Sequence, residues 1–398
     1  VVQMKNMSVQ LTGMNKVRLE TRWQNQNKPQ ARQVLFDNAS ILAFAEGNPS
    51  DAFGDKYKVF DQERKIARLP RPPYKFLDQI VSIKDCEQWA LKAGGVIEAE
   101  YDVPADEWYF TEDNQPYMPF AVLLEVALQP CGWLAAYLGS ALTSDTDLSF
   151  RNLGGRATQY INVSPDIGIL KTRVKITNVS QSGGMIIQNF DYEMTSGQGL
   201  VYKGDTYFGF FSKEALADQI GIREAEPYVP TEEERARGSA FTYPTEAPMP
   251  ADMMRMVDEI SLYVPDGGAN GLGYIEGKAK VKPDTWFFKA HFYQDPVQPG
   301  SLGLDALAQL LARAILLKGL DKGMAEPHVE TIATGAPMKW SYRGQVTPDK
   351  REVVTVMEIT AIEERDDGYL VTARGSLWRD GLRVYEVGPF SLALVDRG

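Results

Sequence analysis

The amino-acid sequence predicts an α+β fold in which one structural unit, an antiparallel sheet wrapped around a single long helix, occurs twice. Three observations predict it. The sequence repeats itself at a lag of about 180 residues, each copy contains one long helix that is apolar on nearly every face, and turn-separated strands follow in each copy. With 398 residues, of which 44% are hydrophobic, the chain is long and apolar enough to bury a sizeable core.

The repeat is carried by four matched pairs of segments that occur in the same order in both copies. Glu125 and Asp305 occupy equivalent places, which sets the lag there at 305 − 125 = 180 residues. Because similar segments in the same order bury similar faces, we expect both copies to fold alike. The pairs are Phe76–Ile80 with Met256–Ile260, Val103–Phe110 with Val281–Phe288, Leu124–Gln129 with Leu304–Gln309, and Val163–Asp166 with Val346–Asp349.

The repeat divides the chain into two units and two other segments. The first unit is predicted at residues 69–223 and the second at residues 252–398. Residues 224–251 are rich in Pro, Glu and Arg, which is typical of a solvated linker. Residues 1–68 fit neither copy and are predicted to be a linker or docking segment, with a short helix at Ile41–Ala45.

The two long helices are predicted at Phe120–Leu138 and Ser301–Leu317. Gly139 follows the first and Lys318-Gly319 follows the second, as is common at the carboxyl ends of helices. Both helices are apolar on nearly every face, which suits a helix that is enclosed by a sheet.

The strands of the second copy are predicted from short β-type segments separated by turn residues. These segments are Val356–Thr360, Tyr369–Thr372 and Arg383–Glu386, and the turns between them are Asp366-Asp367-Gly368 and Asp380-Gly381. Such spacing is typical of an antiparallel meander.

The composition excludes several classes of function. A net charge of −11, without clusters of Lys and Arg, argues against a nucleic-acid partner. The only two cysteines, Cys86 and Cys131, form neither a disulfide framework nor a zinc motif, which favours a reducing, cytoplasmic setting. Nucleophilic-serine, P-loop and metal-binding motifs are also missing from the sequence, so no metal is predicted.

The apolar runs of the sequence and its first residues indicate whether the chain spans a membrane and whether it is part of a longer polypeptide. No run of about 18 uninterrupted apolar residues occurs, so no membrane span is expected. The chain starts on Val1 rather than Met and shows no signal-peptide pattern, so we expect a piece of a longer polypeptide.

Each predicted helix carries a carboxylate and an amide on one face. Glu125 and Gln129 lie four residues apart, as do Asp305 and Gln309. An unpaired carboxylate in an apolar setting costs several kcal/mol or takes up a proton, so a buried one often has a chemical use. The alternative is a structural acid that accepts hydrogen bonds from a helix N-terminus or a tyrosine.

His291 is the candidate base. It is one of two histidines, it follows Trp286 by five residues, and imidazole is the side chain best suited to moving a proton near neutral pH. Asp113 holds the equivalent place after Trp108 in the first copy, which therefore has an acid and no histidine. The second histidine, His328, has no recurring partner and is interpreted as structural.

The residues around His291 resemble the active-site segment of bacterial 3-hydroxydecanoyl-ACP dehydratase/isomerase, an enzyme with a hotdog fold. The similarity continues through Ser341–Val346 and so covers most of the second copy. The two copies together resemble a dehydratase didomain of the polyunsaturated fatty acid synthases, which implies a tandem hotdog fold with a degenerate first copy. The residues that carry the resemblance are Trp286-Phe287-Phe288, His291-Phe292, Asp295-Pro296-Val297, Pro299-Gly300 and Leu302-Gly303-Leu304-Asp305 with Gln309.

The resemblance implies an active site between the two copies, because the family takes its histidine from one hotdog and its acid from the other. His291 would therefore act with Glu125. The resemblance also implies that the Gly300 N–H polarises the thioester carbonyl, that the Val297 carbonyl orients the imidazole and that Gln129 supports the acid.

A second, degenerate site is implied between the opposite halves. Asp113 would face Asp305, which Gln309 supports. Because this combination has no base, the site is expected to be silent.

The implied activity is dehydration of 3-hydroxyacyl thioesters to trans-2-enoyl thioesters in polyunsaturated fatty acid biosynthesis, with isomerisation to a cis-3 product in the nearest relatives. The substrate is expected on the phosphopantetheine of an acyl carrier protein, without a further cofactor. The expected partners are acyl carrier protein domains and other domains of the same synthase, and the double hotdog is expected as a monomer or a homodimer. The alternatives are a hotdog thioesterase, against which His291 argues, and a non-catalytic scaffold for carrier-protein docking.

Overall fold

The strands of the chain form one continuous antiparallel sheet to which each copy contributes half. The computed structural model describes residues 33–113, 115–217, 219–223, 226–242 and 249–398. Within them, 14 strands pair in the order β1-β2-β4-β5-β6-β3-β11-β14-β13-β12-β9-β8-β7, with β10 alongside β14. From β1 and from β8 inward, the two halves repeat the same order, and β7 is an extra strand at the second edge. This confirms the predicted α+β repeat.

The strands of the first half are β1 Gln79–Lys84, β2 Val96–Asp102, β3 Ser149–Gln159, β4 Ile169–Ser182, β5 Met185–Ser196 and β6 Gly199–Phe211. Those of the second are β7 Ser239–Thr242, β8 Glu259–Val264, β9 Tyr274–Lys280, β10 Pro327–Val329, β11 Pro337–Tyr342, β12 Glu352–Arg365, β13 Gly368–Arg379 and β14 Leu382–Asp396. The helices are α3 Asn38–Ala45, α4 Pro49–Phe53, η1 Asp55–Tyr57, α5 Val59–Gln62, α6 Trp108–Glu112, α7 Phe120–Tyr137, η2 Ser140–Thr143, α8 Lys213–Ala217, α9 Glu232–Arg237, α10 Trp286–Ala290 and α11 Gly300–Leu317.

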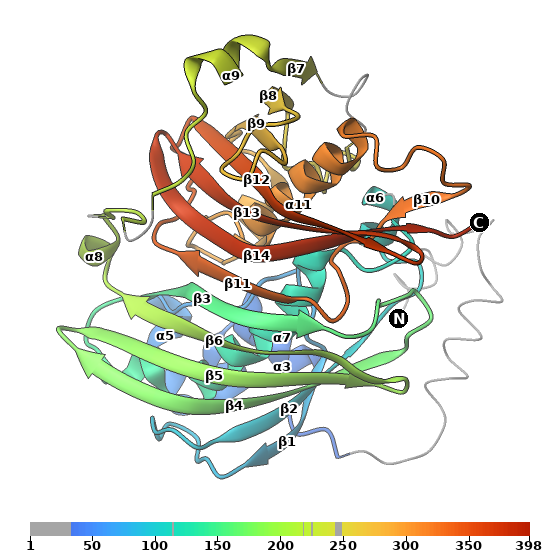
Figure 1. Cartoon of the computed structure of the whole chain (residues 1–398). Coiled ribbons are helices and arrows are strands. Elements are labelled where there is room, and N and C mark those ends of the chain that lie inside the picture. Colours follow the sequence, from blue (N-terminus) through green and yellow to red (C-terminus); the bar gives the residue numbers. More distant parts are fainter. Residues whose placement is uncertain (1–32, 114, 218, 224–225, 243–248) are drawn as a thin grey trace, which may run out of the picture. The chain divides into compact units, whose positions relative to one another are not determined.

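The two halves join where β3 pairs with β11 (Figure 1). Trp340 of β11 lies opposite Gly155 of β3. A Cβ atom at position 155 would lie only 2.4 Å from the Asp205 carbonyl oxygen and 2.6 Å from the Trp340 ring, so only glycine fits here. This close approach lets β3 pair with β11, so the strands of the two copies form one sheet. The core helices of the two copies lie beside each other.

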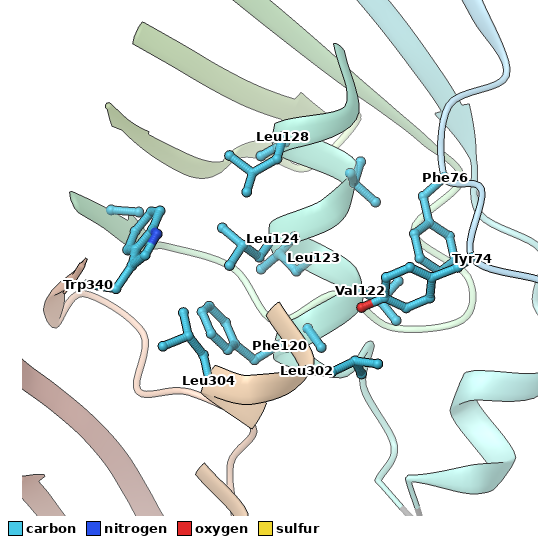
Figure 2. Packing of buried hydrophobic residues seen from close by; sticks show 14 of the residues in the cluster. Tyr74, Phe76, Phe120, Val122, Leu123, Leu124, Leu128, Leu302, Leu304 and Trp340 are labelled. Atoms are coloured by element: carbon cyan, nitrogen blue, oxygen red, sulfur yellow. The ribbon is translucent and has the colours of Figure 1, made fainter. Parts of the chain in front are cut away.

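The core helices α7 and α11 match the predicted helices to within one residue at each end. Gly139 and Gly319 follow their C-caps with φ angles of 78° and 75°, the left-handed conformation that ends many helices. By length and composition both helices are apolar enough to cross a membrane, but 89% of α7 and 72% of α11 are buried inside the protein. Figure 2 shows their side chains packed together near Phe120 and Leu304.

The predicted meander of the second copy is also present. β12, β13 and β14 are consecutive antiparallel neighbours. The β13–β14 hairpin turns through Asp380 and Gly381, whose φ angles of 47° and 82° fit the tight turn that Asp-Gly favours.

The described part of residues 1–68 is folded onto the first copy, so the term linker does not fit it. Residues 1–32 lie outside the described residues. The short helix predicted at Ile41–Ala45 lies within α3. Phe53 and Tyr57 are fully buried, and Phe53 packs against Trp133 of α7 at a ring distance of 5.7 Å. Aromatic burial therefore makes α3, α4, η1 and α5 part of the first unit's core.

The predicted linker 224–251 is also partly structured. A capping box between Thr231 and Glu234 starts α9, and β7 adds to the sheet beside β8. Residues 224–225 and 243–248 lie outside the described residues. The described part of the connection thus extends the sheet of the second unit.

Candidate active site

His291 is held in one orientation at the end of α10. It is the C-cap residue of that helix, and its Nδ1 lies 2.9 Å from the Val297 carbonyl oxygen. If Nδ1–H donates to this carbonyl, Nε2 keeps its lone pair and can accept a proton. The ring stacks on Phe292 at 3.8 Å, and its burial lowers the pKa of His291 to about 3. The imidazole is therefore neutral at physiological pH, in the form that a base requires.

The loop that follows His291 is tied to the other copy by an ion pair. Arg151 of β3 donates hydrogen bonds of 2.7 and 2.8 Å to the two carboxylate oxygens of Asp295. Burial alone would raise the pKa of Asp295, but the charge and hydrogen bonds of Arg151 outweigh it and lower the pKa. The side chain of Arg151 is largely buried, so this bidentate contact is far stronger than an exposed ion pair.

Removing Arg151 should misplace His291. We expect the Arg151→Met variant to lose about 10- to 100-fold in kcat, because a displaced base forfeits its alignment with the substrate while the stem of the side chain is kept. The matched control is Arg156→Met. Arg156 lies on β3, as Arg151 does, and this change removes an exposed ion pair with Asp205. Equal kcat values for both variants would contradict a positioning role for Arg151.

Glu125 lies on α7 within a closed set of hydrogen bonds. Ser301 Oγ lies 2.7 Å from Oε1, and Gln129 Nε2 lies 3.1 Å from Oε2. The Gln129 amide is itself fixed, because it accepts from the Phe76 N–H at 2.8 Å and donates to the Tyr74 carbonyl at 2.9 Å. Burial raises the pKa of Glu125, against the opposing effect of the hydrogen bonds from Ser301 and Gln129. Burial thus shifts the carboxyl group toward the protonated form that a general acid requires.

Two further side chains support Glu125 and escaped sequence reasoning. Ser301 lies at the start of α11, in the other copy, and its Oγ lies 3.0 Å from the hydroxyl of Tyr74. Figure 2 shows the Tyr74 oxygen pointing toward the start of α11, where Leu302 follows Ser301. At the same lag of 180 residues, Ala121 corresponds to Ser301 and Met254 corresponds to Tyr74, so the second site has neither hydroxyl. A position-by-position comparison of the two copies would have found this difference.

His291 and Glu125 open onto one cavity of about 620 Å³, a volume typical of small-molecule sites. Gln129, Val297, Gly300 and Ser301 line it as well, so the structure gathers the predicted site residues of both copies. The rest of the wall includes apolar side chains suited to an acyl chain. Among these are Leu128, Phe150, Met185, Phe208, Phe211 and Leu216.

The opposite halves bring Asp113 and Asp305 together. Gln309 donates to Asp305 at 2.8 Å and is fixed by the Met256 N–H and the Met254 carbonyl, which repeats the arrangement around Gln129. Burial, and then the charge of Asp305, raise the pKa of Asp113, and burial raises that of Asp305. This second site therefore pairs two buried acids and, among the described residues, includes no imidazole.

No cluster of three or more His, Cys, Asp or Glu side chains suited to a metal ion occurs in the part of the chain that the structure describes.

The sequence matches one family twice. Residues 69–205 and 249–388 each match the FabA-like domain. The chain is also 33% identical to one of the proteins that make up the polyunsaturated fatty acid synthase of Thraustochytrium sp., over 87% of this chain and 25% of that protein. It thus spans about a quarter of the length of this curated relative.

Solved structures with a similar fold include the two that follow. One is the dehydratase domain from the CurJ module of curacin polyketide synthase, at 15% identity, with 81% of this chain and 97% of that chain covered and a TM-score of 0.45. The other is a putative oleoyl thioesterase from Lactobacillus plantarum, at 11% identity, with 76% and 97% covered and a TM-score of 0.44.

Proposed function

The chain belongs to the family of FabA-like domains, and we propose that it dehydrates 3-hydroxyacyl thioesters to trans-2-enoyl thioesters at a single site formed by His291 and Glu125. One observation carries the proposal. A neutral histidine and a carboxyl group with a raised pKa, one from each copy, open onto the same cavity. Elimination of water needs a neutral base and a protonated acid, and the two pKa shifts move each group toward the form that it needs.

The reaction follows from the placement of the two groups. His291 Nε2 removes a proton from C2 of the substrate, and the electron pair moves toward the thioester carbonyl. That oxygen accepts a hydrogen bond from the Gly300 N–H at the start of α11, where the helix dipole favours negative charge. Glu125 donates its proton to the 3-hydroxyl, the C3–O bond breaks, and water leaves as the C2–C3 double bond forms. The proton on His291 then returns to Glu125 through water, which restores both groups.

The substrate is proposed to be attached to the phosphopantetheine of an acyl carrier protein within a larger synthase. The curated relative is part of a polyunsaturated fatty acid synthase, and this chain spans 25% of its length, so other synthase domains would be partners. The acyl chain would lie along the apolar wall at Phe150 and Phe208. Isomerisation to a cis-3 product would use the same base and is part of the proposal to be tested.

The test is an assay of the purified chain with 3-hydroxyacyl-N-acetylcysteamine and 3-hydroxyacyl carrier-protein substrates. We expect the mass to fall by one water molecule and an enoyl thioester to appear, with its double-bond geometry read by chromatography against standards. Release of a free thiol instead would identify a thioesterase. The absence of turnover with either substrate would contradict the proposal and favour a scaffold.

The pH profile follows from the two pKa shifts. His291 acts as a base only when it is neutral, which holds above its pKa of about 3, and Glu125 acts as an acid only below its raised pKa. We therefore expect kcat/KM to be level at mildly acidic pH and to fall as the pH rises through the pKa of Glu125. A profile that instead rises with pH near 6.5, the ordinary value for histidine, would contradict the lowered pKa of His291.

A further inference from the structure

The hydroxyl group of Tyr342 is buried in the site without a partner. Tyr342 ends β11, is 4% exposed, and has no hydrogen-bond partner for its hydroxyl among the described residues. Three other buried tyrosines share this property, at positions 192, 202 and 263, but of the four only Tyr342 lines the cavity that His291 and Glu125 share. Because a buried polar group without a partner costs free energy, one on a residue that lines a cavity indicates a partner on the ligand.

The phenol of Tyr342 packs directly on the backbone of Gly300. A Cβ atom at position 300 would lie 2.8 Å from the ring carbons Cε2 and Cζ and 3.0 Å from the hydroxyl oxygen. The N–H of Gly300 is the first of α11 and, like the first N–H groups of any helix, has no acceptor within the helix. The phenol of Tyr342 and the first residue of α11 therefore lie together at the cavity wall.

We infer that Tyr342 is a further catalytic residue, whose hydroxyl donates a hydrogen bond to the substrate's thioester carbonyl beside the Gly300 N–H. This inference rests on the proposed function. As His291 removes the C2 proton, negative charge develops on that oxygen, and two fixed donors in a closed cavity stabilise it more than one does. The bond is strongest in the transition state, so it acts on kcat as well as on binding.

The first copy lacks both the phenol and the glycine on which it packs. Phe120 stands where α11 has Gly300, since Pro119 and Pro299 precede the two helices. Val163 and Val346 differ by 346 − 163 = 183 residues, a lag that pairs Tyr342 with Gln159. The amide of Gln159 already donates to the Ile161 carbonyl and to Asn162. The phenol and the glycine on which it packs thus occur together in the copy that supplies the histidine.

The Tyr342→Phe variant tests this inference, because it removes only the hydroxyl. We expect kcat/KM on a 3-hydroxyacyl thioester to fall about 100-fold, as for the loss of one oxyanion donor, with the melting temperature unchanged or higher. The matched control is Tyr263→Phe, which removes an equally buried, unpartnered hydroxyl that lies outside the cavity. It should keep wild-type kinetics.

A second measurement separates this inference from the proposed function. A saturated acyl-N-acetylcysteamine labelled with ¹³C at the carbonyl cannot be dehydrated, and its carbonyl stretching frequency reports hydrogen bonding in the bound state. We expect Tyr342→Phe to raise that frequency whether or not the wild-type chain dehydrates a substrate. An unchanged frequency would overturn the assignment to the carbonyl, even if turnover fell. Wild-type turnover by Tyr342→Phe would also overturn it.

Discussion

The His291→Ala variant is expected to lose about 100- to 10,000-fold in kcat/KM on a 3-hydroxyacyl thioester, the contribution of one general base. The imidazole is neutral because it is buried, and its Nδ1 contact with the Val297 carbonyl leaves Nε2 as its proton acceptor. The equivalent position in the first copy is Asp113, which belongs to the second site with Asp305, so the first copy supplies no second imidazole. Enoyl thioester formation under initial-rate conditions measures the loss.

The chain's other histidine provides the control. His328 lies on β10, outside the cavity that holds His291, so His328→Ala should retain wild-type activity. Folding of both variants is checked by circular dichroism and thermal melting. Retention of more than about a tenth of the activity by His291→Ala would show that another group removes the proton.

The sequence predicts the fold well because its strongest signals are local or repeated. The enclosed helices α7 and α11 are apolar on most faces, although α11 carries Ser301 and Arg313 besides its acid and amide. A glycine lies just beyond each helix, so the position and type of both can be predicted from local sequence. The helices of residues 38–62 are harder to predict. They are short, and aromatic contacts such as that of Phe53 with Trp133 stabilise them over a long sequence separation.

The site is predictable only in part, for a related physical reason. The spacing of Glu125 and Gln129 on one helix is visible in the sequence, whereas the pairing of His291 with the acid of the other copy came from the family resemblance. The contacts of Ser301 with Glu125 and of Arg151 with Asp295 span 176 and 144 residues. Such contacts depend on the β3–β11 junction, which no local pattern in the sequence specifies.

The two helix acids should respond in opposite ways to substitution. We expect Glu125→Gln to lose about 100- to 10,000-fold in kcat/KM, because the amide keeps the shape of the side chain but has no acidic proton to give to the leaving hydroxyl. We expect Asp305→Asn to keep wild-type kinetics, because Asp305 lies near Asp113 in the second site, where the histidine of the first site is replaced by an acid. The same assay and the same chemical change apply to both variants.

Stability gives these two variants a second, independent measurement. Burial raises the pKa of Asp305, so the folded chain binds more protons than the unfolded chain between the ordinary and the raised pKa, and stability falls as the pH rises through that window. Asp305→Asn removes the ionisable group and should therefore raise the melting temperature at pH 7 to 8 more than at acidic pH. If Asp305→Asn were inactive while Glu125→Gln stayed active, the pairing of His291 with the acid of the first copy would be wrong. The site of Asp113 and Asp305 would then be the catalytic one, although it has no histidine.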